Sequence, residues 1–168
     1  MFARHRVGAA LAAVLPDSSA FRLRAEILRR AGWPIGAEAV FASVPKLVGS
    51  GPLLSRLSVG ENVFVNIGAH WELNERIDIA DHVSIGHEVM LLTTTHRIGT
   101  TDWRAADLIH RPIRIERGAW IGARSLILPG VTVGAGAIVA AGTVVTHDVP
   151  PDSVYGTEGA MVRRSLEG

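Results

Sequence analysis

Histidine is the residue type in this chain best suited to proton transfer near neutral pH, because the imidazole ring titrates in that range. A fifteen-residue segment, 97–111, interrupts an otherwise regular sequence pattern. His96 directly precedes this segment, and His110 lies near its end. Long loops on a rigid scaffold often carry function. The chain has no cysteine, which excludes thiol catalysis, Cys-ligated metal and disulfides. We therefore take residues 97–111 as a candidate functional loop.

The pattern that this loop interrupts has a period of six. From Ile115 the chain divides without a gap into six hexads: IERGAW, IGARSL, ILPGVT, VGAGAI, VAAGTV and VTHDVP. The first position is always Ile or Val and the fifth is small or slender. Helices repeat near 3.6 residues and ordinary strands near 2, so neither explains this period. We interpret each hexad as a short strand plus a corner, with three hexads forming one coil of a triangular solenoid and the first position pointing inward. Gly122, Gly134 and Gly136 fit corners where a side chain would clash or a positive φ is needed.

Looser hexads begin at Ile35, Val59 and Ile79, which brings the expected solenoid to about five coils, or roughly 24 Å of parallel-strand stacking. The sequence thus predicts an all-β fold in which residues 35–158 form a parallel β-helix and residues 97–111 are ejected from it. Residues 1–34 form a helical N-terminal cap and residues 159–168 a C-terminal tail.

The cap is expected to contain a helix over residues 18–31, with Ser18 or Ser19 as N-cap and Gly32 at its end. One face of this helix carries its apolar residues, which are Leu23, Ile27, Leu28 and Ala31. The preceding stretch resembles a weak signal peptide, but its apolar run is only nine residues long, which favours a terminal helix and a cytoplasmic location.

Composition excludes several classes of protein. Seventeen basic residues against sixteen acidic ones leave a net charge of +1, whereas nucleic-acid binders usually show a strong basic surplus. With 48% hydrophobic residues the chain is too apolar for disorder. The uncharged stretch 125–146 is long enough to span a bilayer, but its glycines, its proline and its period of six argue against a spanning helix.

Five segments resemble the hexapeptide-repeat acyltransferases, in particular the maltose/galactoside O-acetyltransferase branch. They are VFVN (63–66), TTTH (93–96), RPIRIERGAWIG (111–122), ILPGVTVGAGAIVAAGTVVTHDVPP (127–151) and AMVRR (160–164). The resemblance implies a left-handed β-helix and transfer of an acetyl group from acetyl-CoA to a saccharide hydroxyl, with no metal. A hydroxyl is a poor nucleophile, so this reaction needs a base near neutral pKa and a donor for the developing oxyanion.

The resemblance also implies residue roles. His96 is the general base, and Asn66 orients the base or the acceptor. The backbone N–H of Ala123 is the oxyanion donor, and Trp120 packs along the pantetheine arm. The positions expected to line the CoA groove are Ala141, Thr146, His147 and Arg164. Asn74 stands where the family usually has an acidic residue that contacts the acceptor sugar.

The resemblance further implies a homotrimer in which His96 of one chain faces Trp120 of the next. Exposed apolar residues on the flat faces of the prism would support such an assembly, and we expect them at Trp71, Leu91, Leu126 and Ile138.

Alternative interpretations stay open from the residues alone. His110 is the rival base, Asn66 could be a corner residue, and Trp120 could be surface packing. The whole chain could be a non-catalytic scaffold or an acyltransferase that uses an acyl carrier protein. A zinc enzyme of the γ-carbonic-anhydrase kind is disfavoured, because Leu92 stands five residues after His87, where a second ligand would be needed.

Overall fold

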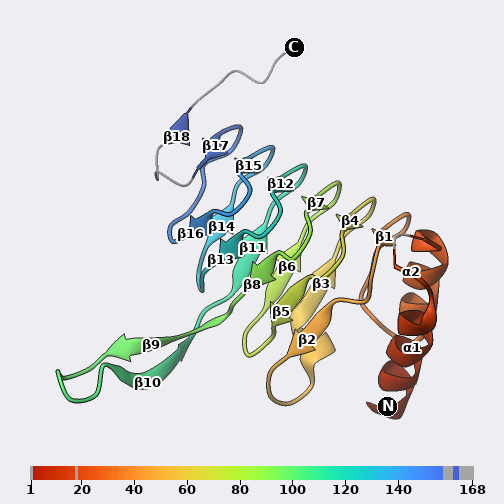
Figure 1. The fold of residues 1–168 in the computed structure, drawn as a ribbon, viewed down its shortest axis with the longest axis horizontal. Coiled ribbons are helices and arrows are strands. Elements are labelled where there is room, and N and C mark those ends of the chain that lie inside the picture. Colours follow the sequence, from red (N-terminus) through yellow and green to blue (C-terminus); the bar gives the residue numbers. More distant parts are fainter. Residues whose placement is uncertain (1, 18, 157–160, 163–168) are drawn as a thin grey trace.

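The strands of the protein wind into a triangular prism that is closed at one end by two helices (Figure 1). This arrangement is seen in a computed structural model that describes residues 2–17, 19–156 and 161–162. Each of the first four coils contributes one short strand to each of three parallel sheets, and the chain beyond them adds strands to two of these sheets only. We call the sheets the first, second and third faces, in the order in which the chain visits them. The predicted parallel β-helix with a helical N-terminal cap is confirmed.

The first face contains β1 (Val40–Phe41), β4 (Phe64–Val65), β7 (Ser84–Ile85), β12 (Trp120–Ile121), β15 (Ile138–Val139) and β17 (Val154–Tyr155), to which β18 (Met161–Val162) adds antiparallel. The second face contains β2 (Lys46–Val48), β5 (His70–Glu72), β8 (Met90–Leu91), β13 (Leu126–Ile127) and β16 (Val144–Val145). The third face contains β3 (Leu57–Val59), β6 (Ile77–Ile79), β11 (Ile113–Ile115) and β14 (Thr132–Val133), and a 3-10 turn, η1 (Leu53–Arg56), precedes it. The solenoid makes about six turns, one more than the hexads predicted.

The core is the axis of the prism, and the hexad positions fill it as predicted. All six first positions from Ile115 to Val145 are buried, and so are all six fifth positions from Ala119 to Val149. Trp71 and Leu91 are also completely buried, so the expectation that they lie on exposed flat faces is wrong. Both occupy first hexad positions, and the inward direction of that position holds for large side chains as well as small ones. Leu126 and Ile138 are half-buried.

Glycine is required at the corners because successive coils approach within backbone contact. A Cβ at Gly122 would lie 2.5 Å from the nitrogen of Ala141, and one at Gly134 would lie 2.5 Å from the nitrogen of Pro151. Gly136 has a φ of +65°, a conformation that side chains disfavour. The three glycines predicted to form corners therefore do so for the two expected reasons.

The cap contains two helices, α1 (Phe2–Val14) and α2 (Phe21–Arg30). The predicted helix begins later than expected, because Ala20, in a left-handed conformation, precedes it without a side-chain cap. Leu28 and Ala31 are buried as predicted, but Leu23 is exposed. Ser18 lies outside the described residues. No helix in the described part of the chain has the length and apolar character to cross a membrane.

Arg24, the residue after Leu23, is buried beneath the cap and has no exposed surface. Its guanidinium donates to main-chain carbonyls at the end of α1, in the connection to α2 and in the first coil. These acceptors are Ala12 (3.3 Å), Leu15 (2.9 Å), Pro16 (2.9 Å), Ser19 (3.0 Å) and Phe41 (2.8 Å). One side chain therefore joins both helices to the solenoid.

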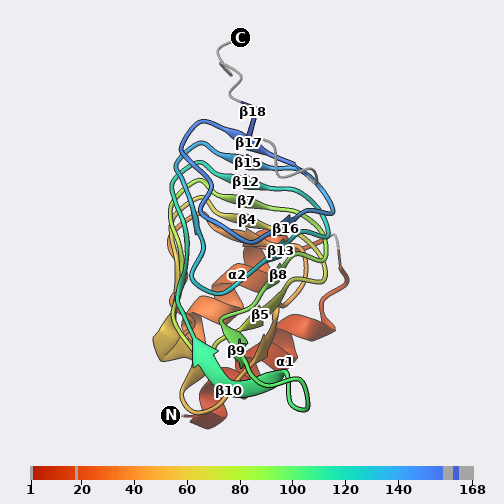
Figure 2. The ribbon, with the colours of Figure 1, turned by 90° about the vertical axis from the view of Figure 1, so that its left-hand side faces the viewer.

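The predicted ejected loop is a β-hairpin formed by β9 (Thr94–Ile98) and β10 (Ala105–His110). It leaves the prism at the corner between the second and third faces (Figures 1 and 2). The coils on either side of it remain paired, because β8 bonds to β13 and β6 bonds to β11. The hairpin is thus an insertion that leaves the strand ladders continuous.

Candidate functional site

His96 lies on β9, with its side chain exposed, and one ring nitrogen is held by the opposite strand. A bulge between Ala105 and Leu108 inserts an extra residue into β10, and the carbonyl oxygen of Ala106 lies 2.6 Å from Nδ1 of His96. Because a carbonyl oxygen only accepts, Nδ1 must carry the proton in the neutral ring. This leaves the Nε2 lone pair available as a base. Bulges commonly redirect a side chain in this way.

His110, the rival base, stands at the root of the same hairpin. Its Nδ1 lies 3.0 Å from the hydroxyl of Thr94, and that hydroxyl also accepts a hydrogen bond of 3.0 Å from the side-chain amide of Asn74. His110 therefore belongs to a polar network that joins the hairpin to the preceding coil. His96 has no comparable side-chain partner within the described residues.

Asn74 uses the hydrogen-bonding groups of its amide within the protein. The oxygen accepts from the backbone N–H of Ser50 at 3.0 Å, and the nitrogen donates to Glu72 at 2.9 Å and to Thr94. The predicted acceptor contact would have to compete with these bonds. Its partner Glu72 was not singled out from the sequence, although a carboxylate at the hexad position that Leu92, Leu128 and Thr146 occupy in other coils is a visible signal.

Asn66, Ala123 and Ala141 lie at another corner, between the first and second faces, in three different coils. The side-chain oxygen of Asn66 accepts from the N–H of the next residue, Ile67, at 2.9 Å. Ala123 follows Gly122, which has no side chain that could accept from its N–H in the same way. The N–H of Ala123 has no acceptor among the described residues. Its carbonyl accepts from Gly142 at 2.8 Å, which fixes the corner. The N–H groups of His87 and Ala141, at the equivalent position of the adjacent coils, likewise have no acceptor in the described part of the chain.

The residue after Ala123 anchors this corner to the coil before it. Arg124 donates to Glu88 at 2.7 Å, and both residues have a positive φ. The hydrogen bond from Arg124, together with its charge, lowers the pKa of Glu88. A Cβ at Gly86 would lie 2.6 Å from the nitrogen of Ala123, so the two corners are in backbone contact.

Trp120 lies on β12, at the first-face side of the same corner, and about half of its surface is exposed. Its register neighbours are Ser84 and Ile138. Ala141 is also exposed and Ala123 is half-buried, so this corner presents an apolar edge on the strand that leads to the unpaired N–H of Ala123. Such an edge suits a flexible apolar chain that ends in a carbonyl.

The remaining predicted residues are divided between the second corner and the tail. Thr146 and His147 follow β16 at the corner between the second and third faces, and the hydroxyl of Thr146 lies 2.8 Å from Nδ1 of His147. Arg164 lies outside the described residues.

A single chain therefore does not assemble all of the predicted site. His96, Asn74, Thr146 and His147 belong to the corner between the second and third faces, whereas Asn66, Trp120, Ala123 and Ala141 belong to the corner between the first and second. The whole second face separates the two groups.

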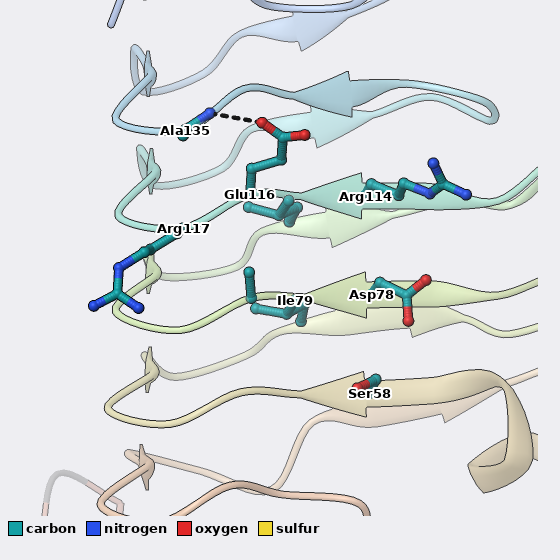
Figure 3. Close-up of a pocket in the computed structure, with 9 residues that line it drawn as sticks. Ser58, Asp78, Ile79, Arg114, Glu116, Arg117 and Ala135 are labelled. Atoms are coloured by element: carbon teal, nitrogen blue, oxygen red, sulfur yellow. Dashed lines mark hydrogen bonds between the residues drawn. The ribbon is translucent and has the colours of Figure 1, made fainter. Parts of the chain in front are cut away.

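A shallow hollow of about 410 Å³ lies on the third face and contains no residue predicted for the site (Figure 3). Its lining includes Asp78, Arg114 and Glu116, and Glu116 accepts from the backbone N–H of Ala135 at 3.0 Å. No group of three or more potential metal-binding side chains occurs within residues 2–17, 19–156 and 161–162.

Comparison with known proteins agrees with this fold. A family described as "Hexapeptide repeat of succinyl-transferase" matches residues 112–147. Galactoside O-acetyltransferase of Escherichia coli is 32% identical over 112 residues, which are 67% of this chain and 55% of that protein. The chain spans about half the length of the curated relatives that it matches.

Solved structures extend the similarity to nearly the whole chain. A hexapeptide-repeat acetyltransferase of Vibrio cholerae, in complex with acetyl-CoA, has a TM-score of 0.76 and 29% identity over 99% of this chain and 89% of that one. A galactoside acetyltransferase in complex with coenzyme A has a TM-score of 0.72 and 23% identity over 96% of this chain and 79% of that one, a likeness of fold.

Fold and sequence thus define a hexapeptide-repeat solenoid protein that is similar to the hexapeptide-repeat acetyltransferases. Within that class, the predicted resemblance to the galactoside and maltose O-acetyltransferases is confirmed.

Proposed function

We propose that this protein transfers an acetyl group from acetyl-CoA to a hydroxyl group of a saccharide or a similar acceptor. The observation that carries the proposal is the exposed ring of His96, whose Nδ1 is bound to the Ala106 carbonyl and whose Nε2 is left as a base. The names of relatives support the acyl donor and the acceptor class, since a galactoside O-acetyltransferase and an acetyl-CoA complex are among them.

In the proposed reaction, Nε2 of His96 takes the proton of the acceptor hydroxyl as its oxygen attacks the thioester carbonyl carbon of acetyl-CoA. The negative charge that develops on the carbonyl oxygen is stabilised by the backbone N–H of Ala123. When the carbon–sulfur bond breaks, the imidazolium returns the proton to the sulfur, which leaves as the CoA thiol. Asn66 orients the base or the acceptor.

The donor would lie along the edge formed by Trp120, with Trp120 against the pantetheine arm. Ala141, Thr146, His147 and Arg164 are proposed to line the rest of the CoA groove. Asn74 is proposed for the acceptor side.

The site is proposed to be completed in a homotrimer. The side of the hairpin that carries His96 also carries Ile98 and Leu108, which are 87% and 56% exposed. A two-stranded hairpin with an uncovered apolar side is marginally stable alone. Packing of that side against a second copy would bring His96 to the corner of Trp120 and Ala123, which one chain keeps apart. A cytoplasmic location remains part of the proposal.

The test is a panel of sugars and nucleotide sugars, assayed for release of CoA from acetyl-CoA by the wild-type chain and by His96→Ala. Acceptor-dependent release that His96→Ala abolishes would support the proposal. No release with any acceptor, together with no thermal stabilisation by acetyl-CoA, would contradict it, because a bound donor must raise the melting temperature.

A further inference from the structure

We propose that Glu72 is a positioning residue for His96: its carboxylate holds the root of the hairpin and thereby sets the place of the base. The inference rests on the proposed function, because it concerns the same site. Glu72 follows the buried Trp71 at the end of β5 and is itself half-buried on the second face.

The hairpin creates the need for such a group. The N–H of Leu92 still bonds to the carbonyl of Ile127 in the adjacent coil, at 3.0 Å. The N–H groups of Thr93 and Thr94 come next, where the chain leaves the ladder. One carboxylate oxygen of Glu72 accepts from both, at 3.1 and 2.9 Å. A buried N–H without a partner is destabilising, so this carboxylate substitutes for the interrupted ladder.

The other groups of Glu72 hold the same two threonines. Its second carboxylate oxygen accepts from the amide of Asn74 at 2.9 Å, and that amide also donates to the hydroxyl of Thr94. Its main-chain carbonyl accepts from the hydroxyl of the buried Thr93 at 2.8 Å, and that hydroxyl accepts from the N–H of Glu75 at 3.1 Å. The root of β9 is therefore fixed through main chain and side chains together.

An acid at this position is not a requirement of the repeat. The strand register places Val48, Leu92, Leu128 and Thr146 at the equivalent position of the other coils. The carboxylate occurs only in the coil against which the hairpin begins. We infer that it serves the hairpin, and not the solenoid.

The position of this root determines the position of the base. Thr94 and His96 are two residues apart on one strand and therefore face the same side of the hairpin. A change in the direction of β9 at Thr94 moves His96 with it. Displacement of a catalytic group by about 1 Å can reduce a rate on the order of 10²-fold.

The test variant is Glu72→Gln, which keeps the size of the side chain. A glutamine has one oxygen and one NH₂ group, so in either orientation a donor faces a donor, at Asn74 or at the two threonine N–H groups. We expect kcat to fall on the order of 10²-fold with the KM for acetyl-CoA unchanged. Glu38→Gln is the matched control, since it removes an exposed carboxylate paired with Arg22 at the cap. An unchanged kcat in Glu72→Gln would overturn the proposal.

A double variant separates positioning from general loss of structure. If Glu72 acts through His96, Glu72→Gln should lower the activity of His96→Ala no further. A further loss that multiplies the two single effects, or a rise in the KM for acetyl-CoA, would show that Glu72 acts elsewhere.

A measurement that needs no activity distinguishes this inference from the proposed function. Amide hydrogen exchange at Thr93 and Thr94 should be faster in Glu72→Gln than in the wild type and in Glu38→Gln. If the wild type transferred no acetyl group, the proposed function would fail. The exchange rates would still test whether Glu72 anchors the root of the hairpin. Unchanged exchange at both amides would overturn it.

Discussion

His96 and His110 are carried by the same hairpin, but their rings are held differently. Nδ1 of His96 bonds to a main-chain carbonyl, whereas Nδ1 of His110 faces the hydroxyl of Thr94 within the root network. The first arrangement fixes the tautomer in which Nε2 is a base. The second makes His110 part of the support of the hairpin.

We therefore expect His96→Ala to lower kcat by roughly 10²–10⁴, the usual contribution of a general base. The side chain is exposed, so the melting temperature should not change. Steady-state kinetics and circular dichroism check both expectations. A larger loss of kcat in His110→Ala would transfer the role of base to that residue.

The unpaired N–H of Ala123 leads to a second prediction at this scale. Ala123→Ser keeps the donor and should remain active, whereas Ala123→Pro removes it and should lower kcat about 10²–10³-fold. The kcat values are compared only if the two variants have equal melting temperatures, so that disruption of the corner is separated from loss of the donor. Equal activity in the two variants would mean that this N–H does not contact the reacting carbonyl.

Trp120 gives a prediction for the donor alone. Because its exposed indole forms the apolar edge beside Ala123, Trp120→Ala should raise the KM for acetyl-CoA more than the KM for the acceptor. Initial rates with each substrate varied in turn make the comparison. If the donor KM does not change, Trp120 has only a packing role.

The sequence indicated which residues bear chemistry, but not what holds them. His96 was predicted as the general base, partly from its place beside the interrupting segment. Its bond to Ala106 depends on a bulge in β10 that no residue pattern predicts. Asn74 was predicted as an acceptor contact, and its amide is occupied by Ser50, Glu72 and Thr94. Contacts between coils depend on register, and a register is fixed only when the whole stack has formed.

Among the elements, the cap depends most on a single side chain. Arg24 is a buried cation whose five acceptors are all main-chain carbonyls. Four of them belong to the last residues of α1 and the connection that follows it. Loss of Arg24 would take a donor from each of these carbonyls, at a cost of about 1–3 kcal/mol for each one that is left buried and unpaired.

We expect Arg24→Met to open the cap while the solenoid stays folded, because the strand ladders do not depend on it. Limited proteolysis should then cleave between α1 and α2 at least tenfold faster than in the wild type, which corresponds to about 1.4 kcal/mol of local stability. Arg22→Met is the control, since Arg22 forms only an exposed pair with Glu38. Equal cleavage rates in the two variants would disprove the role of Arg24.

The hexads predicted the strands well because their period is imposed by the geometry of the prism. The cap was predicted less well for a physical reason. A hydrophobicity pattern predicts a surface position for any arginine. The burial of Arg24 is favourable only because main-chain carbonyls converge on it at the end of α1. Those carbonyls come from residues 12 to 41, a range that no helical periodicity connects.

For the whole molecule, we expect a trimer, with a mass of three times 17.9 kDa, or 53.7 kDa. Light scattering after gel filtration measures it. The exposed Ile98 on the hairpin provides the perturbation, since Ile98→Asp places a charge on the proposed contact without touching the core. This variant should be monomeric and inactive. A fully active wild-type species of 17.9 kDa would contradict both the assembly and the shared site.

The continuity of the strand ladders across the hairpin has a consequence for how such a protein can diversify. Since β8 pairs with β13 and β6 with β11 on either side of the insertion, the length and composition of residues 95–109 are not constrained by the core. Natural variation can therefore alter the surroundings of the acceptor while the inherited scaffold stays intact. New specificities would then arise at little risk to folding, provided that the anchoring residues at the root are retained.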